Sequence, residues 1–134
     1  MNATTHPERV QKRNRLRTHR DFERATKAGA RVSRPEFVLY HAAGEGSPVP
    51  RIGFAVGKRI GGAVVRNRVR RRLREAVRPL IGRLAACDVV IVARPAAVGA
   101  GVEDLGRAIA QAASGAGLLR PPTSRHNRGT EPGA

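Results

Sequence analysis

Seven arginines and a single acid, Glu75, lie in the segment VVRNRVRRRLREAVRP at residues 64–79. Guanidinium groups that are held close together repel one another in water, so this density of like charge indicates a polyanion that neutralises it. A solvated helix face usually mixes charge signs and is the weaker interpretation. Because a planar guanidinium binds phosphate through two hydrogen bonds and stacks on bases, the segment predicts a surface for RNA or DNA, between which charge alone does not choose.

The composition of the whole chain also favours a nucleic-acid partner. The chain has 134 residues, a net charge of +16 and a pI near 11.9, which favours nucleic acid over an anionic membrane surface. No apolar run approaches the roughly 18–20 residues that span a bilayer, and the segment MNATTHPERVQKRNR lacks the apolar core of a secretory signal. We therefore expect a cytoplasmic protein that binds no membrane.

The residue types that usually carry out catalysis are present but scattered. The ten acids are dispersed, and His41 has no partner at a useful spacing. Glu103 and Asp104 are neighbours in a predicted helix, so their side chains diverge, and acids at a helix start are the simpler interpretation. Cys87, the only cysteine, is expected to be buried in the core. The sequence thus predicts no catalytic residue and no metal site on this chain.

The elements that must position the arginines begin with a helix and two strands. The segment THRDFERATKAG at residues 18–29 has a capping-box-like start and ends at Gly29, which is suited to the left-handed position after a helix. The segments RPEFVLYHA and RIGFAVG are typical of strands, and the turn residues GEGSPVP between them predict a hairpin. Because side chains alternate along a strand, Val38 and Tyr40 lie on the face opposite Phe37 and Leu39.

The arginine segment itself is typical of an amphipathic helix. Gly61 and Gly62 permit a tight bend before it, and Pro79 ends it. Arg66 falls within the apolar arc, which is tolerable because the first turn of a helix is open to solvent. The other arginines share the remaining arc with Asn67. The apolar arc recurs at helical spacing and consists of Val65, Val69, Leu73, Ala76, Val77 and Leu80.

The second half of the chain predicts one more strand and one more helix. The segment CDVVIVARP is a nearly continuous β-branched run, as expected of a central strand that is covered on both faces. The segment GVEDLGRAIAQAASG has apolar residues at helical intervals. We expect a flexible basic arm at residues 1–17, one RNA-binding domain at residues 18–114 and a disordered tail at residues 115–134, which has too little apolar surface to fold.

Residues 51–78, RIGFAVGKRIGGAVVRNRVRRRLREAVR, closely resemble the bacterial protein subunit of ribonuclease P. The hallmark is Arg66-Asn67-Arg68, which follows a glycine-containing strand and a basic, glycine-bearing turn. The segments KRNRLRTHRDFERATKAGARVSRPEFVLY and DVVIVARP extend the resemblance to about residues 11–113. It implies a two-layer α/β (α+β) sandwich in the order αβββαβα, similar to a ribosomal-protein domain. It further implies a mixed sheet with a short first strand at residues 30–33 and a left-handed βαβ crossover, where the general rule predicts a right-handed one.

The resemblance also implies a function. A large ribonuclease P RNA would carry the active site with its Mg²⁺ ions and remove the 5′ leader of precursor tRNA, while this chain would assist as the protein subunit and bind no cofactor by itself. No protein partner is predicted. The rival hypothesis is a ribosomal or general RNA-binding protein without a processing role, since fold alone does not separate the two. A nuclease that acts through its own side chains is disfavoured by the dispersed acids.

The functional positions of the family carry over onto residues of this sequence. The cleft between the first helix and the sheet would hold the leader through Phe22, Val38 and Tyr40, although an isolated aromatic is more often a core residue than a platform for a base. Thr26 stands where many relatives carry a second aromatic. In the basic arm, Lys12, Arg13 and Arg15 are the candidate site residues. The residues that would dock on the catalytic RNA are Lys58, Arg59, Arg66, Asn67, Arg68, Arg70, Arg71, Arg72 and Arg74.

Overall fold

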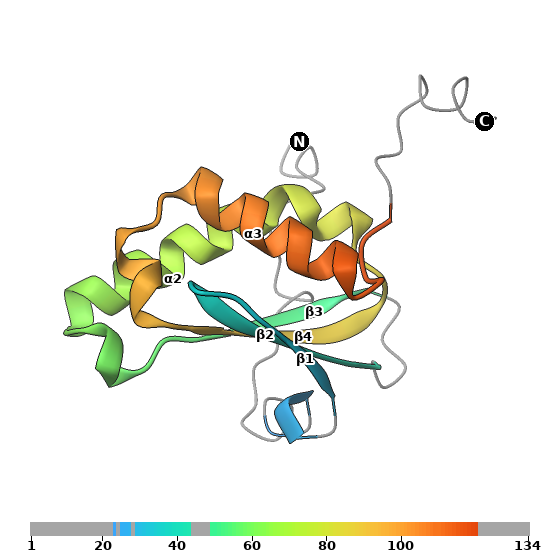
Figure 1. Ribbon diagram of the computed structural model, residues 1–134, viewed down its shortest axis with the longest axis horizontal. Helices are drawn as coiled ribbons and strands as arrows, with labels where there is room; N and C mark the ends of the chain where they lie inside the picture. The colour runs from blue at the N-terminus through green and yellow to red at the C-terminus, as the bar shows by residue number, and fades with distance from the viewer. Residues whose placement is uncertain (1–22, 24, 28, 44–48, 121–134) are drawn as a thin grey trace, which may run out of the picture.

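A four-stranded mixed sheet with two helices across one face forms the body of the protein (Figure 1). The computed structural model describes residues 23, 25–27, 29–43 and 49–120. The strands are β1 (Ala30–Ser33), β2 (Phe37–Ala43), β3 (Arg51–Ala55) and β4 (Cys87–Ala93). The helices are α2 (Ala63–Val77) and α3 (Val102–Gly115), and the short 3-10 helices are η3 (Lys58–Ile60), η4 (Arg78–Arg83) and η5 (Pro95–Gly99).

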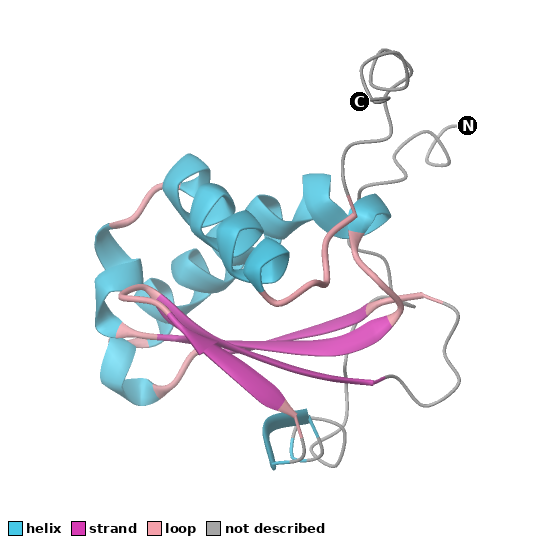
Figure 2. Cartoon of the chain, turned by 45° about the vertical axis from the view of Figure 1, so that its right-hand side comes forward, coloured by secondary structure: helices cyan, strands magenta, loops and turns pink. Residues whose placement is uncertain are grey.

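This architecture confirms the two-layer sandwich, its element order from β1 onward and the short first strand at residues 30–33. Of the predicted first helix, Glu23 and residues 25–27 are helical, and they lie on the side of the sheet away from α2 and α3 (Figure 2). The rest of that helix and the basic arm lie outside the described residues. In the described part of the chain, no helix is long and apolar enough to cross a membrane.

The predicted hairpin between residues 34–42 and 51–57 is wrong. The strand order is β1-β2-β4-β3, so β4 lies between the two strands that were expected to pair. β4 is antiparallel to β2 and parallel to β3, and the antiparallel hairpin is formed by β1 and β2 instead. A strand that is apolar on both faces is most stable with a strand on each side, and this preference outweighs the turn residues between β2 and β3. The central place of β4 is confirmed.

The parallel strands β3 and β4 are joined through α2, so the chain contains the expected βαβ unit. Its left-handed crossover stays a prediction. α2 ends at Val77, and the chain continues as η4 with Pro79 in its first turn. Pro79 therefore marks the end of the helix, as predicted from its ring and its missing N–H.

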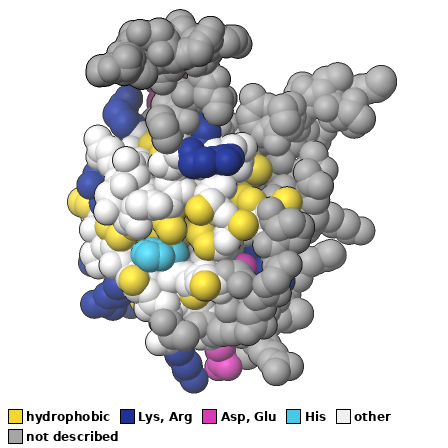
Figure 3. Space-filling model, turned by 90° about the vertical axis from the view of Figure 1, so that its right-hand side faces the viewer, with side chains coloured by type: hydrophobic (Ala, Val, Ile, Leu, Met, Phe, Trp, Pro, Cys, Tyr) yellow, Lys and Arg dark blue, Asp and Glu magenta, His cyan; other side chains and the backbone are white. Residues whose placement is uncertain are grey.

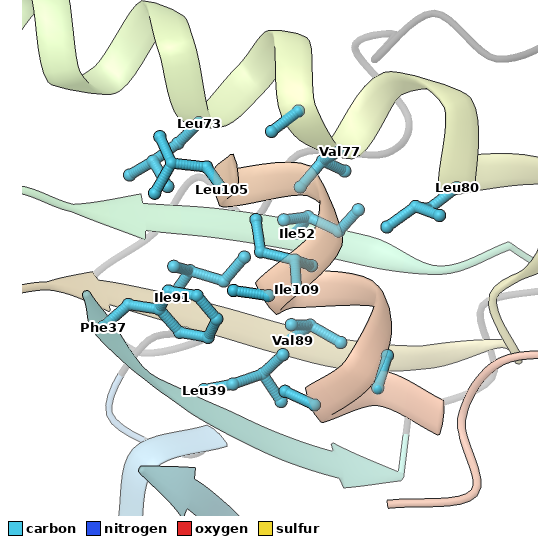
Figure 4. Close-up of a cluster of buried hydrophobic side chains, with 14 of the residues drawn as sticks. Phe37, Leu39, Ile52, Leu73, Val77, Leu80, Val89, Ile91, Leu105 and Ile109 are labelled. Carbon is cyan, nitrogen blue, oxygen red and sulfur yellow. The ribbon is translucent and has the colours of Figure 1, made fainter. Parts of the chain in front are cut away.

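The main core lies between the helices and the sheet. Val69 and Ala76 of α2 are buried there with the apolar residues of α3, and Val65 is partly buried, which confirms the predicted apolar arc. Gly106 of α3 faces Ala76 of α2, where an added Cβ would lie 3.5 Å from the carbonyl oxygen of Ala76, an ordinary contact distance. Cys87 is buried in this core, where burial and then the charge of Asp88 raise the pKa of its thiol. Figure 4 shows the centre of the core with Phe37, Leu39, Ile52, Leu73, Val77, Val89, Ile91, Leu105 and Ile109.

Gly29 has a different role from the one predicted. Its φ is not in the left-handed region, so it is no left-handed helix cap. An added Cβ would instead overlap the carbonyl oxygen of His41 and lie 2.6 Å from that of Ala25. Glycine is needed at this position because two backbone segments meet there.

The predicted boundary of the tail lies too early in the chain. Leu118 is buried, and Leu119 forms a β-bridge with Leu84. The N–H of Arg120 donates to the carbonyl oxygen of Arg83 at 2.8 Å. The two adjacent leucines supply the apolar surface that anchors this segment, so the folded domain extends at least to residue 120. Residues 121–134 lie outside the described part.

Candidate nucleic-acid interface

The turn from η3 into α2 fixes where the arginines begin. Gly61 has φ 152° and ψ −168°, a conformation that favours glycine, and an added Cβ would lie 3.0 Å from the Cβ of Val65. The backbone N–H of Arg66 donates to the carbonyl oxygen of Gly62, and its Nε donates to that of Gly61 at 3.0 Å. This second bond explains why Arg66 is tolerated at the edge of the apolar arc. The guanidinium of Arg66 thus closes the turn between η3 and α2.

The arginines of α2 occupy two rows and the ridge between them. At 100° per residue, Arg66, Arg70 and Arg74 form one row and Arg68 and Arg72 the other. All five are half-buried, because their stems cover the flanks of the helix. Between the rows, the exposed ridge carries Asn67 and Arg71.

Little on this helix offsets the positive charge. Arg70 Nη1 donates to Asn67 Oδ1 at 3.1 Å, which holds the pair across one turn. Glu75 lies 3.4 Å from Arg78 at the far end of α2. Lys58 and Arg59 are exposed on η3, directly before the helix. We call Lys58, Arg59, Arg66, Asn67, Arg68, Arg70, Arg71 and Arg74 the basic surface.

Arg72 is held by the protein itself. Its Nη1 donates to the carbonyl oxygens of Val98 at 3.2 Å and of Ala100 at 3.4 Å. The first carbonyl belongs to η5 and the second to the residue that follows it, and η5 contacts η3. The guanidinium thus ties α2 to a turn next to Lys58. A direct contact of Arg72 with RNA stays a prediction, but its hydrogen bonds to Val98 and Ala100 are structural ones.

We expect Arg72→Ala to lower the stability of the fold more than Arg71→Ala does. Losing two bonds from a charged donor costs roughly 1–2 kcal/mol of unfolding free energy, whereas Arg71 is exposed and its loss costs about 0.5 kcal/mol or less. RNA affinity should fall more for Arg71→Ala. Thermal melts and RNA titrations of the two variants check this. A stability equal to the wild type in Arg72→Ala would show that the η5 contact contributes nothing.

The sheet offers a second candidate surface on its outer face, the face opposite α2 and α3. Tyr40 pairs with Val90, and Val38 pairs with Val92, so these side chains line this face. Ala25 packs against it from the helical residues. The expectation that Phe37 and Leu39 face the core while Tyr40 faces away is confirmed.

Other predicted site residues lie partly or wholly outside this description. Phe22 of the cleft and Lys12, Arg13 and Arg15 of the basic arm are not among the described residues. The Oγ1 of Thr26 donates to the carbonyl oxygen of Glu23 at 3.2 Å, within its own helix. The leader-binding roles of these residues stay predictions.

A buried ion pair, which no local sequence pattern indicates, lies at one end of the outer face. Asp88 is fully buried, and the guanidinium of Arg51 holds both carboxylate oxygens at 2.9 Å. The two residues are register partners, Arg51 at the first position of β3 and Asp88 at the second position of β4. Their pairing follows from the parallel register, which the predicted hairpin had hidden. Asp88 is therefore neutralised by Arg51 and is not a spare catalytic carboxylate.

The end of the molecule at which β3 and β4 begin shows apolar side chains in the centre of the view, with basic side chains mainly to the left, above and below and few acids among the described residues in view (Figure 3). Among the described residues, no three metal-ligating side chains gather in one place. The chemistry that these surfaces support is binding through charge, hydrogen bonds and stacking.

Comparison with known proteins agrees with this geometry. A family model described as Ribonuclease P matches residues 10–116. The chain is 44% identical over 87 residues to the ribonuclease P protein component of Streptomyces avermitilis, an alignment that covers 59% of this chain and 71% of that protein. It is 41% identical over 85 residues to the component from Bacillus velezensis, covering 63% and 73%.

Solved structures show the same fold. The RNase P protein of Staphylococcus aureus superposes with a TM-score of 0.73 at 26% identity, covering 80% of this chain and 98% of that one. The RNase P protein of Thermotoga maritima gives a TM-score of 0.65 at 25% identity, covering 72% and 92%. Sequence and structure therefore agree on the same relatives.

Proposed function

Because the chain belongs to the ribonuclease P protein family, we propose that its basic surface binds the catalytic RNA of ribonuclease P and that its outer sheet face binds the 5′ leader of precursor tRNA. Membership of the family associates the chain with an endoribonuclease complex and with processing of the tRNA 5′ end. The observation that carries the proposal is the division of α2 into a buried apolar arc and a basic outer surface. A rigid helix of this kind holds its cations in fixed places for a folded RNA.

The proposed mechanism is electrostatic. Catalytic RNA and precursor tRNA repel each other, and each phosphate neutralised by an arginine lowers that repulsion. The protein would thus replace part of the Mg²⁺ that the RNA pair needs for approach. Hydrolysis itself would take place on the RNA with its bound Mg²⁺, an assignment that rests on the family resemblance.

Reconstitution tests this function. Cleavage of precursor tRNA by a bacterial ribonuclease P RNA is measured over a series of Mg²⁺ concentrations, with and without the full-length chain. We expect the chain to lower the Mg²⁺ requirement and to cut nothing alone. Cleavage by the chain alone would overturn the proposal, and RNA binding without any rescue at low Mg²⁺ would favour the general RNA-binding alternative.

Tyr40→Ala should weaken binding of the leader and leave the rest of the substrate unaffected. Stacking of one base on an aromatic ring contributes about 1–3 kcal/mol, so affinity for leader-bearing tRNA should fall roughly tenfold. Tyr40→Phe keeps the ring and serves as the control. Affinities of the reconstituted complex for precursor and leaderless tRNA check the prediction. Equal weakening for both substrates would show that Tyr40 does not contact the leader.

A further inference from the structure

An open pocket of about 470 Å³ lies between the β1–β2 turn, η5 and α3, and no residue of α2 lines it. Figure 1 and Figure 2 both show the β1–β2 turn beside η5. Small residues, among them Ala96, Ala100 and Ala108, form part of its wall. The turn contributes Arg34 and Glu36. The pocket therefore combines small apolar residues with the charged pair Arg34 and Glu36 on the turn and a second charged pair, Asp104 and Arg107, on α3.

Both charged groups of the turn carry a buried atom without a hydrogen-bond partner among the described residues. These atoms are Nε of Arg34 and Oε1 of Glu36. The backbone around them is well fixed, because the N–H of Arg34 donates to the carbonyl oxygen of Phe37 at 2.8 Å and the N–H of Arg94 donates to that of Glu36 at 2.9 Å. Arg34 Nη2 also donates to Gln111 Oε1 at 3.0 Å, so the guanidinium is held in place. A buried donor and a buried acceptor on a rigid frame indicate a ligand that offers both kinds of group.

We propose that this pocket binds a guanine base. Guanine presents two neighbouring donors, N1–H and N2–H, which match the two oxygens of the Glu36 carboxylate, and its O6 and N7 accept from a guanidinium such as Arg34. No other standard base has two adjacent donors. Bases of single-stranded RNA are commonly bound through this edge and stacked on arginine planes, and the small wall residues leave room for a flat ring.

The surrounding charges argue against a lysine or arginine side chain of another protein as the ligand. Arg107 lines the pocket with its partner Asp104, at 2.6 Å, and Arg94 Nη1 donates to the carbonyl oxygen of Arg34 at 3.3 Å. With Arg107 paired to Asp104, Arg34 and Arg94 still outnumber the single carboxylate of Glu36, so a further cation is disfavoured. A nucleotide pairs a neutral base with an anionic phosphate, which these arginines attract.

Mononucleotide titration of the full-length chain tests the proposal without any assumption about ribonuclease P. GMP, IMP and AMP carry the same phosphate, and IMP lacks only the N2 amino group of GMP. Amide NMR shifts should move at Arg34, Glu36 and Gln111. GMP should bind roughly tenfold more tightly than AMP, with IMP between them. Equal binding of GMP and AMP would overturn the proposal.

A matched pair of variants ties the preference to one carboxylate. Glu36→Gln should abolish the preference for GMP over AMP, because an amide cannot accept both guanine donors. Glu103→Gln removes the same charge from an exposed position outside the pocket and should keep it. The amide spectrum of each variant shows that it is folded. A preference that survives in folded Glu36→Gln contradicts the assignment.

The same base chemistry is available from RNA and from free nucleotides, and crosslinking separates the two sources. Ribonuclease P RNA and precursor tRNA that contain 6-thioguanosine are irradiated in complex with the chain. A crosslink to residues 34–36 identifies a guanine of RNA as the ligand. If no crosslink forms but the chain still prefers GMP over AMP, the ligand is a free guanine nucleotide. Both results are independent of the test of the proposed function, which measures the Mg²⁺ requirement of cleavage.

Discussion

Replacing both Arg68 and Arg71 with alanine is expected to weaken binding of ribonuclease P RNA on the order of 100-fold at low salt, since each charged contact with a phosphate is worth about 1.5 kcal/mol or more. Both residues belong to the basic surface, one on a flank of α2 and one on its exposed ridge. Their loss should also flatten the plot of log affinity against log salt by about two units, because two fewer counterions are released. Binding titrations at several salt concentrations measure both effects.

The control for this pair removes the same charge nearby. Arg78, which is exposed, and Arg83, which is half-buried, lie at the two ends of η4, beyond the basic surface. Alanine at both positions should change the affinity much less and leave the salt dependence close to that of the wild type. If the two double variants lose affinity equally, the total charge and not the arrangement on α2 governs binding, and the basic surface is wrongly assigned.

Asp88→Ala should destabilise the fold by roughly 3–5 kcal/mol, because it leaves the guanidinium of Arg51 half-buried without its carboxylate partner. Unfolding in urea, followed by circular dichroism, measures this loss. The exposed carboxylate of Asp104, which also pairs with an arginine, is the matched control, and its removal should cost about 1 kcal/mol or less.

A second variant distinguishes the ion pair from simple packing. Arg51→Leu combined with Asp88→Leu replaces both charges with apolar groups, so neither is left unpaired in the sheet. The double variant should be more stable than Asp88→Ala. An equal or larger loss in the double variant would mean that Asp88 acts through its other contacts and not through Arg51.

The local elements were predictable from the sequence where one physical signal dominated. The apolar arc of α2 is such a case, because burial of Val69, Leu73 and Val77 follows directly from their helical spacing. The alternation along β2 likewise placed Tyr40 and Leu39 on opposite faces. The short strand β1 came only from family resemblance, since four residues with mostly exposed side chains carry too weak a pattern.

Strand pairing was not predictable in the same way. The turn residues at 44–50 favoured a local hairpin, but pairing depends on what a third strand gains, and β4 gains most between β2 and β3. The contact between Arg51 and Asp88 was not predictable for the same reason, because it requires the parallel register of β3 and β4. The hydrogen bonds from Arg72 to the end of η5 and the residue after it were not predictable either, because no local pattern distinguishes an arginine that binds RNA from one that donates to a backbone carbonyl.

The central position of β4 also bears on synthesis of the chain. Both β2 and β3 pair with β4 and not with each other, so β3 cannot join the β1–β2 hairpin before residues 87–93 have left the ribosome. Until then the nascent polypeptide carries two apolar strands without a common neighbour, together with the most basic helix of the molecule. Folding must therefore wait for the last third of translation, and fragments that stop before Cys87 should be substrates for proteases and chaperones.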